Sequence, residues 1–159
     1  MNKKVRSFVI AIIIPLAVGG LSALLTMGSM DLYETIIQPP LSPPAILFPI
    51  VWTILYTLMG ISSGIIYNSP NGTEAARNNA LAVYALQLFI NFIWSIVFFN
   101  LRAFLPAFVL ILVLWVLIIV MIIRFYKIDK TAALLQIPYL LWVTFAAYLN
   151  FAIWLLSRY

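Results

Sequence analysis

Aromatic and amide side chains recur at helical spacing in three hydrophobic stretches of the sequence. Steps of three and four residues place such side chains on one face of a helix. Flat rings on a cavity wall stack against a planar ligand, and a few amides orient its polar substituents. The pattern therefore predicts a pocket for a large planar apolar ligand. The three stripes are Trp52, Tyr56, Met59 and Ser63; Tyr84, Gln87, Asn91, Trp94 and Phe98; and Tyr139, Trp142, Phe145, Ala146, Leu149 and Asn150.

Each stripe also has a simpler interpretation, which is packing. Tyr148 suits an aromatic belt at the membrane–water boundary, and Gln87 suits a hydrogen bond between helices. Trp52, Asn91 and Trp142 lie well inside their stretches, where a belt has no use. Packing remains the simpler explanation for any single residue, whereas three stripes of one chemistry favour a pocket.

The composition excludes several kinds of chemistry. The 159 residues contain no Cys and no His, so the common thiolate and imidazole ligands and bases are missing. The 9 Lys and Arg and the 4 Asp and Glu all lie outside the middle of the hydrophobic stretches. Pumps, antiporters and voltage sensors place ionisable groups there. We therefore expect no metal site and no acid–base pair.

The elements that carry the stripes are membrane-spanning helices. The chain is 65% hydrophobic and 8% charged, against about 25% charged residues in soluble domains. A spanning helix needs about 20 mostly apolar residues. The sequence predicts a single domain over residues 1–159, an all-α integral membrane bundle of five transmembrane helices. The predicted spans are residues 8–27, 45–67, 80–99, 104–123 and 131–156.

Two of the spans need a separate remark. The span at 8–27 follows basic residues, as a cleaved signal peptide would, but it is longer than the usual signal core of about 7–15 residues. We expect a retained helix. The span at 104–123 is almost uniformly aliphatic, which suggests broad exposure to lipid.

The loop at 28–44 is the longest connection. It holds Pro39, Pro40, Pro43 and Pro44, which fix φ and remove backbone donors, so the segment from Gln38 to Pro44 cannot be regular helix. A long loop in a compact protein is more often functional than idle. We expect a rigid lid over the pocket.

Basic residues indicate the orientation. Seven of the nine Lys and Arg fall on the side that holds the N-terminus and the second and fourth loops. The positive-inside rule places that side, with the N-terminus, in the cytoplasm and the C-terminus outside the cell membrane. These residues lie at span ends and form no patch, so nucleic acid is not an expected partner. Faces for a dimer are offered by Gly19, Gly20, Ser22 and Ala23, or by Ala80, Ala82 and Ala85.

The chain resembles the TspO/translocator protein family, the tryptophan-rich sensory proteins that include the peripheral benzodiazepine receptor. The resemblance covers essentially the whole chain and rests on three ordered motifs. These are QPPLSPPAILFPIVWTILYTLMG (38–60), LQLFINFIWSIVFF (86–99) and IPYLLWVTFAAYLNFAIW (137–154).

The resemblance implies a five-helix homodimer with a ligand pocket beneath the first loop. It implies porphyrins such as protoporphyrin IX as ligands or substrates, and isoquinoline and benzodiazepine drugs as further ligands, with no covalently bound cofactor. The pocket residues carried over by motif are Pro43 and Pro44 in the lid, and Trp52, Asn91, Trp94, Trp142, Phe145 and Ala146; the stripes add Tyr56. Leu41 and Ile46 stand where the family's lid usually has Trp, and the sterol pattern of animal members is not intact at Leu149 to Leu155.

Three functions remain open on this basis. The first is a membrane tetrapyrrole-binding protein that senses, transports or helps degrade porphyrin. The second is a light- and oxygen-dependent porphyrin-degrading enzyme in which Trp52 and Trp142 give up an electron. The third is a transporter of small amphipathic compounds. Because the chain has no His, we expect free porphyrin to bind in preference to haem.

Overall fold

The fold is a bundle of long helices. The computed structural model describes residues 1–29 and 31–159, and within these ranges all regular structure is helical. Five helical segments are long and apolar enough to cross a membrane, which confirms the predicted all-α architecture. The elements are α1 (Lys3–Thr26), the 3₁₀ turn η1 (Met27–Ser29), α2 (Asp31–Thr35), α3 (Leu47–Asn68), α4 (Glu74–Ser95), the π-helical turn η2 (Ile96–Asn100), α5 (Phe104–Tyr126), α6 (Lys130–Leu135) and α7 (Ile137–Leu156).

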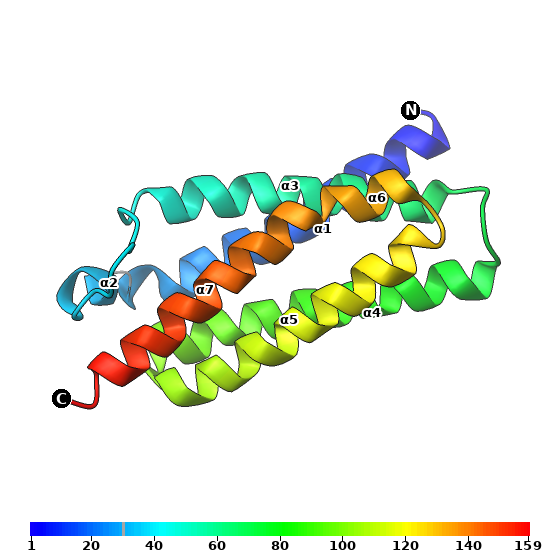
Figure 1. The fold of residues 1–159 in the computed structure, drawn as a ribbon. Helices are drawn as coiled ribbons and strands as arrows, with labels where there is room; N and C mark the ends of the chain where they lie inside the picture. The colour runs from blue at the N-terminus through cyan, green and yellow to red at the C-terminus, as the bar shows by residue number, and fades with distance from the viewer. Residues whose placement is uncertain (30) are drawn as a thin grey trace.

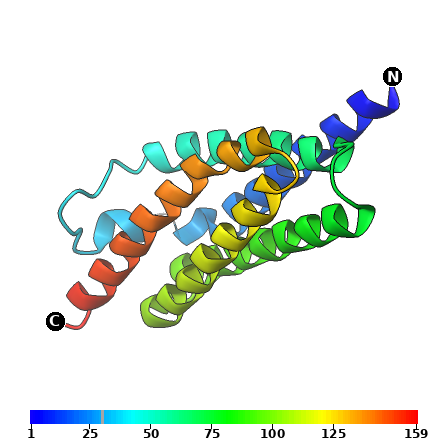
Figure 2. The ribbon, with the colours of Figure 1, turned by 45° about the vertical axis from the view of Figure 1, so that its right-hand side comes forward.

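The long helices form a ring in the order α3, α1, α4, α5 and α7 (Figures 1 and 2). α1 packs along α3 and touches α4, α4 packs along α5, and α5 packs along α7. α6 lies against both α3 and α5 and closes this end of the ring. The ring leaves α3, α4 and α7 facing a common interior, so the three stripes converge.

Three helix starts have side-chain caps, at Asn2, Thr73 and Asp129, and the first two set the start of long helices. Asn2 accepts a 2.9 Å hydrogen bond from the backbone N–H of Lys4, and Thr73 accepts one of 3.0 Å from Ala76. Such caps satisfy backbone donors that the first turn leaves unpaired. The helices therefore begin before the apolar stretches do, at Lys3 and Glu74.

The last predicted span is divided in two at Gln136, which ends α6 and precedes α7. Pro138 has no backbone N–H to donate into the preceding turn. The N–H of Gln136 instead bonds to the carbonyl of Ala133 at 3.1 Å. The first loop also differs from the prediction. Residues 28–44, expected to be a continuous loop, contain part of η1 and all of α2.

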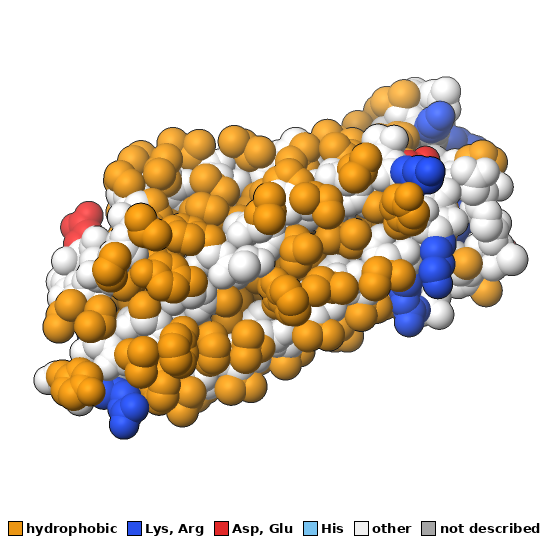
Figure 3. All heavy atoms as spheres, viewed as in Figure 1, with side chains coloured by type: hydrophobic (Ala, Val, Ile, Leu, Met, Phe, Trp, Pro, Cys, Tyr) orange, Lys and Arg blue, Asp and Glu red, His pale blue; other side chains and the backbone are white. Residues whose placement is uncertain are grey.

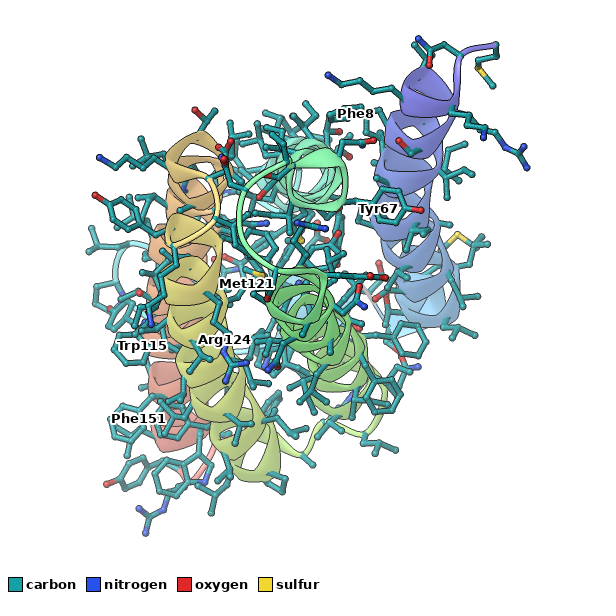
Figure 4. All side chains as sticks on the ribbon, turned by 90° about the vertical axis from the view of Figure 1, so that its right-hand side faces the viewer. Phe8, Tyr67, Trp115, Met121, Arg124 and Phe151 are labelled. Atoms are coloured by element: carbon teal, nitrogen blue, oxygen red, sulfur yellow. The ribbon has the colours of Figure 1, made fainter. Side chains whose placement is uncertain are left out.

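The fourth span is less buried than the second, third and fifth, in line with its expected exposure to lipid, but this holds for only part of its surface. One face of α5 is fully buried where it packs against α4, α6 and α7. Six residues at helical spacing form this face: Ala107, Ile111, Leu114, Ile118, Met121 and Phe125. Met121 points toward the bundle interior and Trp115 lies on its outer side (Figure 4). Uniform aliphatic composition gives no contrast between faces, so the sequence did not show this one. The most exposed span is α1, with 11% of its central window buried against 28% for α5.

Close contact between α1 and α3 depends on small residues. A Cβ added at Gly60 would lie 2.5 Å from the Cα of Ile12, and one at Gly64 would lie 2.6 Å from the Phe8 ring. Phe8 is seen on α1 at the end of the bundle that holds the N-terminus (Figure 4). A Cβ at Gly19 would meet the ring of Tyr56. Gly19 therefore serves packing within the chain, whereas Gly20 has open space beside it.

The surface divides into an apolar middle and polar ends. Figure 3 shows hydrophobic side chains over the middle of the visible face and charged side chains gathered at its two ends. At the more basic end, Arg124 of α5 donates to Asn79 of α4, and Asn71 donates to the carbonyl of Ile128 at 3.3 Å, which joins the two loops there. This distribution fits a multi-pass membrane protein.

Candidate functional site

A cavity of about 540 Å³ lies between α1, α3, α4 and α7 and reaches Tyr33 on α2. Six residues that the sequence selected line it: Trp52, Tyr56, Asn91, Trp94, Trp142 and Ala146. Three further members of the stripes line it as well, namely Phe98, Leu149 and Asn150. Residues far apart in the chain thus form one wall, because α3, α4 and α7 turn their striped faces inward.

Other members of the stripes lie deeper than the cavity wall. Gln87 is fully buried and Tyr139 is 1% exposed, but neither lines the cavity. Met59 and Ser63 are also buried in the bundle. Helical spacing identified the correct face, and the packing of neighbouring helices decides how much of that face borders the cavity.

The structure places three of the predicted residues off the cavity wall. Pro43 and Pro44 belong to the loop above it, and Phe145 lies on the far side of Trp142. There Phe145 borders a groove of about 400 Å³ on the outer surface, together with Val51 and Leu141. Its ring centroid is 5.8 Å from that of Trp142. Trp142 therefore separates the inner cavity from the outer groove.

The sequence did not select the part of the wall that α1 contributes. Leu16, Gly19, Ser22 and Ala23 line the cavity from this side. They carry no aromatic signal, and their small-residue pattern pointed to helix packing instead. Because these side chains are small, they leave open the space of the cavity, which aromatic residues of α3 and α7 border on the other side.

The aromatic side chains of the wall support one another. The rings of Trp52 and Tyr56 stack with centroids 5.4 Å apart, and Trp52 meets Tyr139 edge-on at 6.2 Å. Phe48 meets Trp142 edge-on at 5.8 Å. Offset and edge-to-face pairs of this kind are favourable. The rings are thus held in place before any ligand arrives.

Most polar groups of the wall are already paired within the protein. The indole N–H of Trp94 donates to Asn150 at 3.0 Å, and Asn150 donates to the carbonyl of Phe104 at 2.8 Å. The hydroxyls of Ser22 and Ser95 lie 2.6 Å apart and share a hydrogen bond. These groups hold α1, α4 and α7 together and contribute shape to the cavity.

Two polar groups on the wall are free to meet a ligand. Asn91 donates from Nδ2 to the hydroxyls of Tyr56 at 3.3 Å and Tyr139 at 3.2 Å. Its Oδ1 has no hydrogen-bond partner among the described residues. The Tyr56 hydroxyl accepts from Asn91 and donates to none of the described residues, whereas the unpaired indole N–H of Trp142 is itself buried and does not face open space. The cavity therefore offers one acceptor and one donor in an otherwise apolar wall.

The proline-rich loop is fastened by two tyrosines. Tyr33 of α2 donates to the carbonyl of Pro43 at 2.7 Å, and Tyr148 of α7 donates to the carbonyl of Pro40 at 2.8 Å. Burial raises the pKa of the Tyr33 phenol above 10.0, so it keeps the proton that it donates. Between these two points Leu41 adopts φ 68°, a left-handed conformation. The loop is thus held at both sides of the cavity mouth.

Comparison with known proteins gives the family. The model of the TspO/MBR family matches residues 11–155. The chain is 37% identical over 157 residues to the tryptophan-rich protein TspO of Chlorobaculum tepidum, covering 96% of this chain and 97% of that protein. It is 32% identical over 139 residues to the protein CrtK of Rhodobacter capsulatus, covering 87% and 85%. It is 33% identical over 122 residues to the translocator protein of sheep, Ovis aries, covering 77% and 72%.

The chain belongs to the TspO/MBR family. This confirms the resemblance found from the three motifs. The structure shows where the two lid positions that depart from the expected pattern lie. Leu41 is 81% exposed and Ile46 is 67% exposed, and neither lines the cavity.

Candidate metal ligands do not gather at the cavity. Among the residues the structure describes, no group of three or more His, Cys, Asp or Glu side chains is placed to hold a metal ion.

Proposed function

We propose that this TspO/MBR protein binds a planar tetrapyrrole such as protoporphyrin IX in the cavity between α1, α3, α4 and α7. One observation carries the proposal. Tryptophans from three helices, Trp52, Trp94 and Trp142, line a single cavity. Its volume of about 540 Å³ falls within the range of about 300–1,000 Å³ for small-molecule pockets.

The same wall suits aromatic drugs of the isoquinoline-carboxamide and benzodiazepine types. Such ligands present flat rings and one or two polar atoms, and the wall offers ring faces with one free acceptor and one free donor. Burial of aromatic surface supplies most of the affinity. The free groups on Asn91 and Tyr56 then orient the ligand.

Free porphyrin is the favoured form of the ligand. Haem iron is usually held by His, Cys, Met or Tyr, and the sequence has no His and no Cys. Met27 and Tyr33 on the wall are the remaining candidates of these types near the mouth. Tyr33 is engaged with the lid. We therefore expect protoporphyrin IX to bind more tightly than haem.

A carrier role is favoured by an opening in the cavity wall. Gly20 and Ala23 of α1, and Pro49 and Thr53 of α3, line the cavity and are also exposed on the outside of the bundle. The cavity thus reaches the apolar surface between α1 and α3. A ligand that dissolves in lipid is able to exchange there, and accumulation of unchanged ligand in proteoliposomes would support transport.

An enzymatic role is the second candidate, and it is favoured by the placement of two oxidisable side chains. Trp52 and Trp142 both line the cavity. Bound porphyrin would absorb light, dioxygen would be the oxidant, and an indole would supply an electron. Phe at both positions removes the indoles and keeps flat rings, so product should disappear while most binding remains. Unchanged product formation in this double variant would refute the role.

A homodimer is part of the proposal. Ala82 and Ala85 are exposed on α4, next to the exposed Leu86 and Phe89. Small residues allow close approach of helices within a membrane. The chain has no Cys, so Ala82→Cys places one thiol in each subunit. Disulfide-linked dimers in native membranes are expected for Ala82→Cys and not for Leu112→Cys on the exposed side of α5.

The deciding experiment is titration of the purified protein with protoporphyrin IX, followed by quenching of tryptophan fluorescence, in the dark and then in light. Trp142→Ala is expected to weaken dark binding by about tenfold or more, the equivalent of about 1.4 kcal/mol. Trp115→Ala is the matched control, because Trp115 lies outside the cavity and bonds to Thr144. Equal affinities for the two variants, or no saturable binding by the wild type, would contradict the proposed site.

A further inference from the structure

Asn91 stands between the cavity and a deeper pair of buried side chains. Its side chain is 2% exposed and lines the cavity. Its two amide hydrogens are directed to the hydroxyls of Tyr56 and Tyr139, at 3.3 and 3.2 Å. In this arrangement its free Oδ1 is an acceptor, so the ligand must bring the donor.

The orientation of the Asn91 amide is set from behind the wall. Tyr139 donates its hydroxyl proton to Oε1 of Gln87 at 2.6 Å, and its oxygen is therefore left to accept from Asn91. Tyr139 is 1% exposed and Gln87 is fully buried. Neither residue lines the cavity, yet together they decide which end of the Asn91 amide faces it.

The same contacts allow the opposite direction of donation. If the Gln87 amide turns over, its Nε2 donates to Tyr139, and the Tyr139 proton then goes to Oδ1 of Asn91. The Asn91 amide turns with it and presents its NH₂ group, a donor, to the cavity. An amide carries an acceptor and two donors on atoms of similar size, so the exchange needs no change in packing.

The two arrangements are balanced because each leaves one end of Gln87 unpaired and each keeps Asn91 bonded to Tyr56, whose hydroxyl accepts from Asn91 in the first and donates to its Oδ1 in the second. In the arrangement described above, Nε2 of Gln87 has no partner among the described residues. In the reversed one, Oε1 of Gln87 is the unpaired atom. A ligand that bonds to Asn91 in one arrangement and not in the other will shift the balance toward the one it prefers.

We propose that Gln87 and Tyr139 are specificity-determining positioning residues, which let Asn91 offer either an acceptor or a donor to the bound ligand. The proposal rests on the proposed function only in that an aromatic ligand occupies this cavity. Gln87 is essential to it because it takes the Tyr139 proton in one arrangement and supplies a proton in the other. Without Gln87 the Tyr139 proton is left with Oδ1 of Asn91 as its acceptor.

The test uses three flat three-ring probes with the full-length protein in detergent at pH 8. Carbazole carries an N–H donor, neutral acridine carries a ring-nitrogen acceptor, and anthracene carries neither. The wild type should bind carbazole and acridine with similar Kd values, each about three- to tenfold below that of anthracene, as one net hydrogen bond provides. A wild-type preference above tenfold for either heterocycle would contradict the two balanced arrangements.

Gln87→Leu should separate the two heterocycles. The Tyr139 proton must then go to Oδ1 of Asn91, so Asn91 presents its NH₂ group permanently. Acridine should keep its affinity, and carbazole should fall to the level of anthracene. Gln87→Met is closer in shape and carries the same expectation if the Leu variant does not fold. An unchanged ratio of carbazole to acridine affinity in both variants would overturn the proposal.

Two further variants separate this role from packing. Adding Tyr139→Phe to Gln87→Leu removes the proton that held Asn91, so carbazole binding should recover, which a packing defect would not produce. Gln136→Leu is the matched control, since Gln136 is equally buried but has no bond to Tyr139 or Asn91, and its ratio should equal that of the wild type. Protoporphyrin IX is titrated in parallel. Its failure to bind beside a shifted probe ratio would refute the proposed function alone, and its binding beside an unshifted ratio would refute this inference alone.

Discussion

The indole N–H of Trp94 donates a 3.0 Å hydrogen bond to Oδ1 of Asn150, which joins α4 to α7 on the cavity wall. The Nδ2 atom of Asn150 in turn donates to the carbonyl of Phe104, at the start of α5. Asn150 is 1% exposed and Trp94 is 7% exposed. A single buried amide thus joins three helices, α4, α5 and α7.

Replacement of Asn150 by Leu should destabilise the bundle. It leaves the Trp94 N–H buried without a partner and removes the side-chain bond to the Phe104 carbonyl, which costs about 1–3 kcal/mol of unfolding free energy. Equilibrium unfolding in SDS measures the loss. The double variant with Trp94→Phe should lose less than the sum of the two single variants, because the unpaired indole N–H is gone. Strict additivity would show that this hydrogen bond contributes nothing.

Replacement of Gly60 by Ala should disrupt the packing of α1 on α3. The new Cβ would lie 2.5 Å from the Cα of Ile12 and 2.8 Å from the carbonyl oxygen of Ala11, and backbone atoms cannot turn aside. We expect a loss of about 1–3 kcal/mol, as for other overpacked sites. Gly20→Ala is the control, because nothing lies within 4 Å of its Cβ. Equal stability of the two variants in SDS titrations would contradict the close contact.

Removal of the two hydroxyls that fasten the lid should speed ligand release. Tyr33→Phe with Tyr148→Phe deletes the bonds to the carbonyls of Pro43 and Pro40. Each bond is worth about 0.5–1.5 kcal/mol, so the double variant should release protoporphyrin IX about five- to a hundredfold faster in stopped-flow displacement. Tyr67→Phe, on the exposed end of α3, should match the wild type. Identical release rates would show that the lid does not control the cavity mouth.

Proton loss from Tyr33 provides a pH test of the same contact. Because burial raises its pKa above the usual value for tyrosine, the phenol stays protonated at neutral and mildly alkaline pH, and its bond to Pro43 persists there. Release rates should therefore be flat from pH 6 to pH 9 and should rise only in strongly alkaline solution. In Tyr33→Phe the alkaline rise should be reduced. A rise centred below pH 9 in the wild type would contradict burial of this group.

The orientation predicted from the basic residues can be read with single thiols. In intact cells a membrane-impermeant maleimide should label Ile37→Cys in the first loop, because that loop is expected outside. It should label Ala75→Cys, in the first turn of α4, only after the cells are opened. Both positions are exposed. The reverse pattern would place the N-terminus outside.

The sequence was sufficient to predict the helical architecture and to select, within the stripes, several residues that line the cavity. Trp52, Asn91 and Trp142 were selected because helical spacing placed them together far from the span ends, and all three line the cavity. Phe145 belongs to the same stripe, but it falls about 60° to one side of Trp142 on the helix. That difference places Phe145 in the outer groove. Spacing alone does not show which edge of a stripe a neighbouring helix will cover.

The contribution of α1 was the least predictable part. Its cavity residues, among them Gly19 and Ser22, have no chemistry of their own that points to a ligand. The buried face of α5 was missed for the opposite reason, because every residue along it is apolar. In a membrane both faces of a helix prefer apolar side chains, so shape complementarity between helices, which one sequence does not display, decides burial.

The residues described around the cavity include no Lys, Arg, Asp or Glu, and the charged side chains lie at the ends of the bundle (Figure 3). Transfer of an uncharged ligand into this site therefore moves no protein charge through the electric field of the membrane. The transmembrane voltage does work only on charge that is displaced across it. Occupancy of the site by a neutral ligand should thus be the same in energised and de-energised cells, and it should follow the amount of ligand dissolved in the lipid.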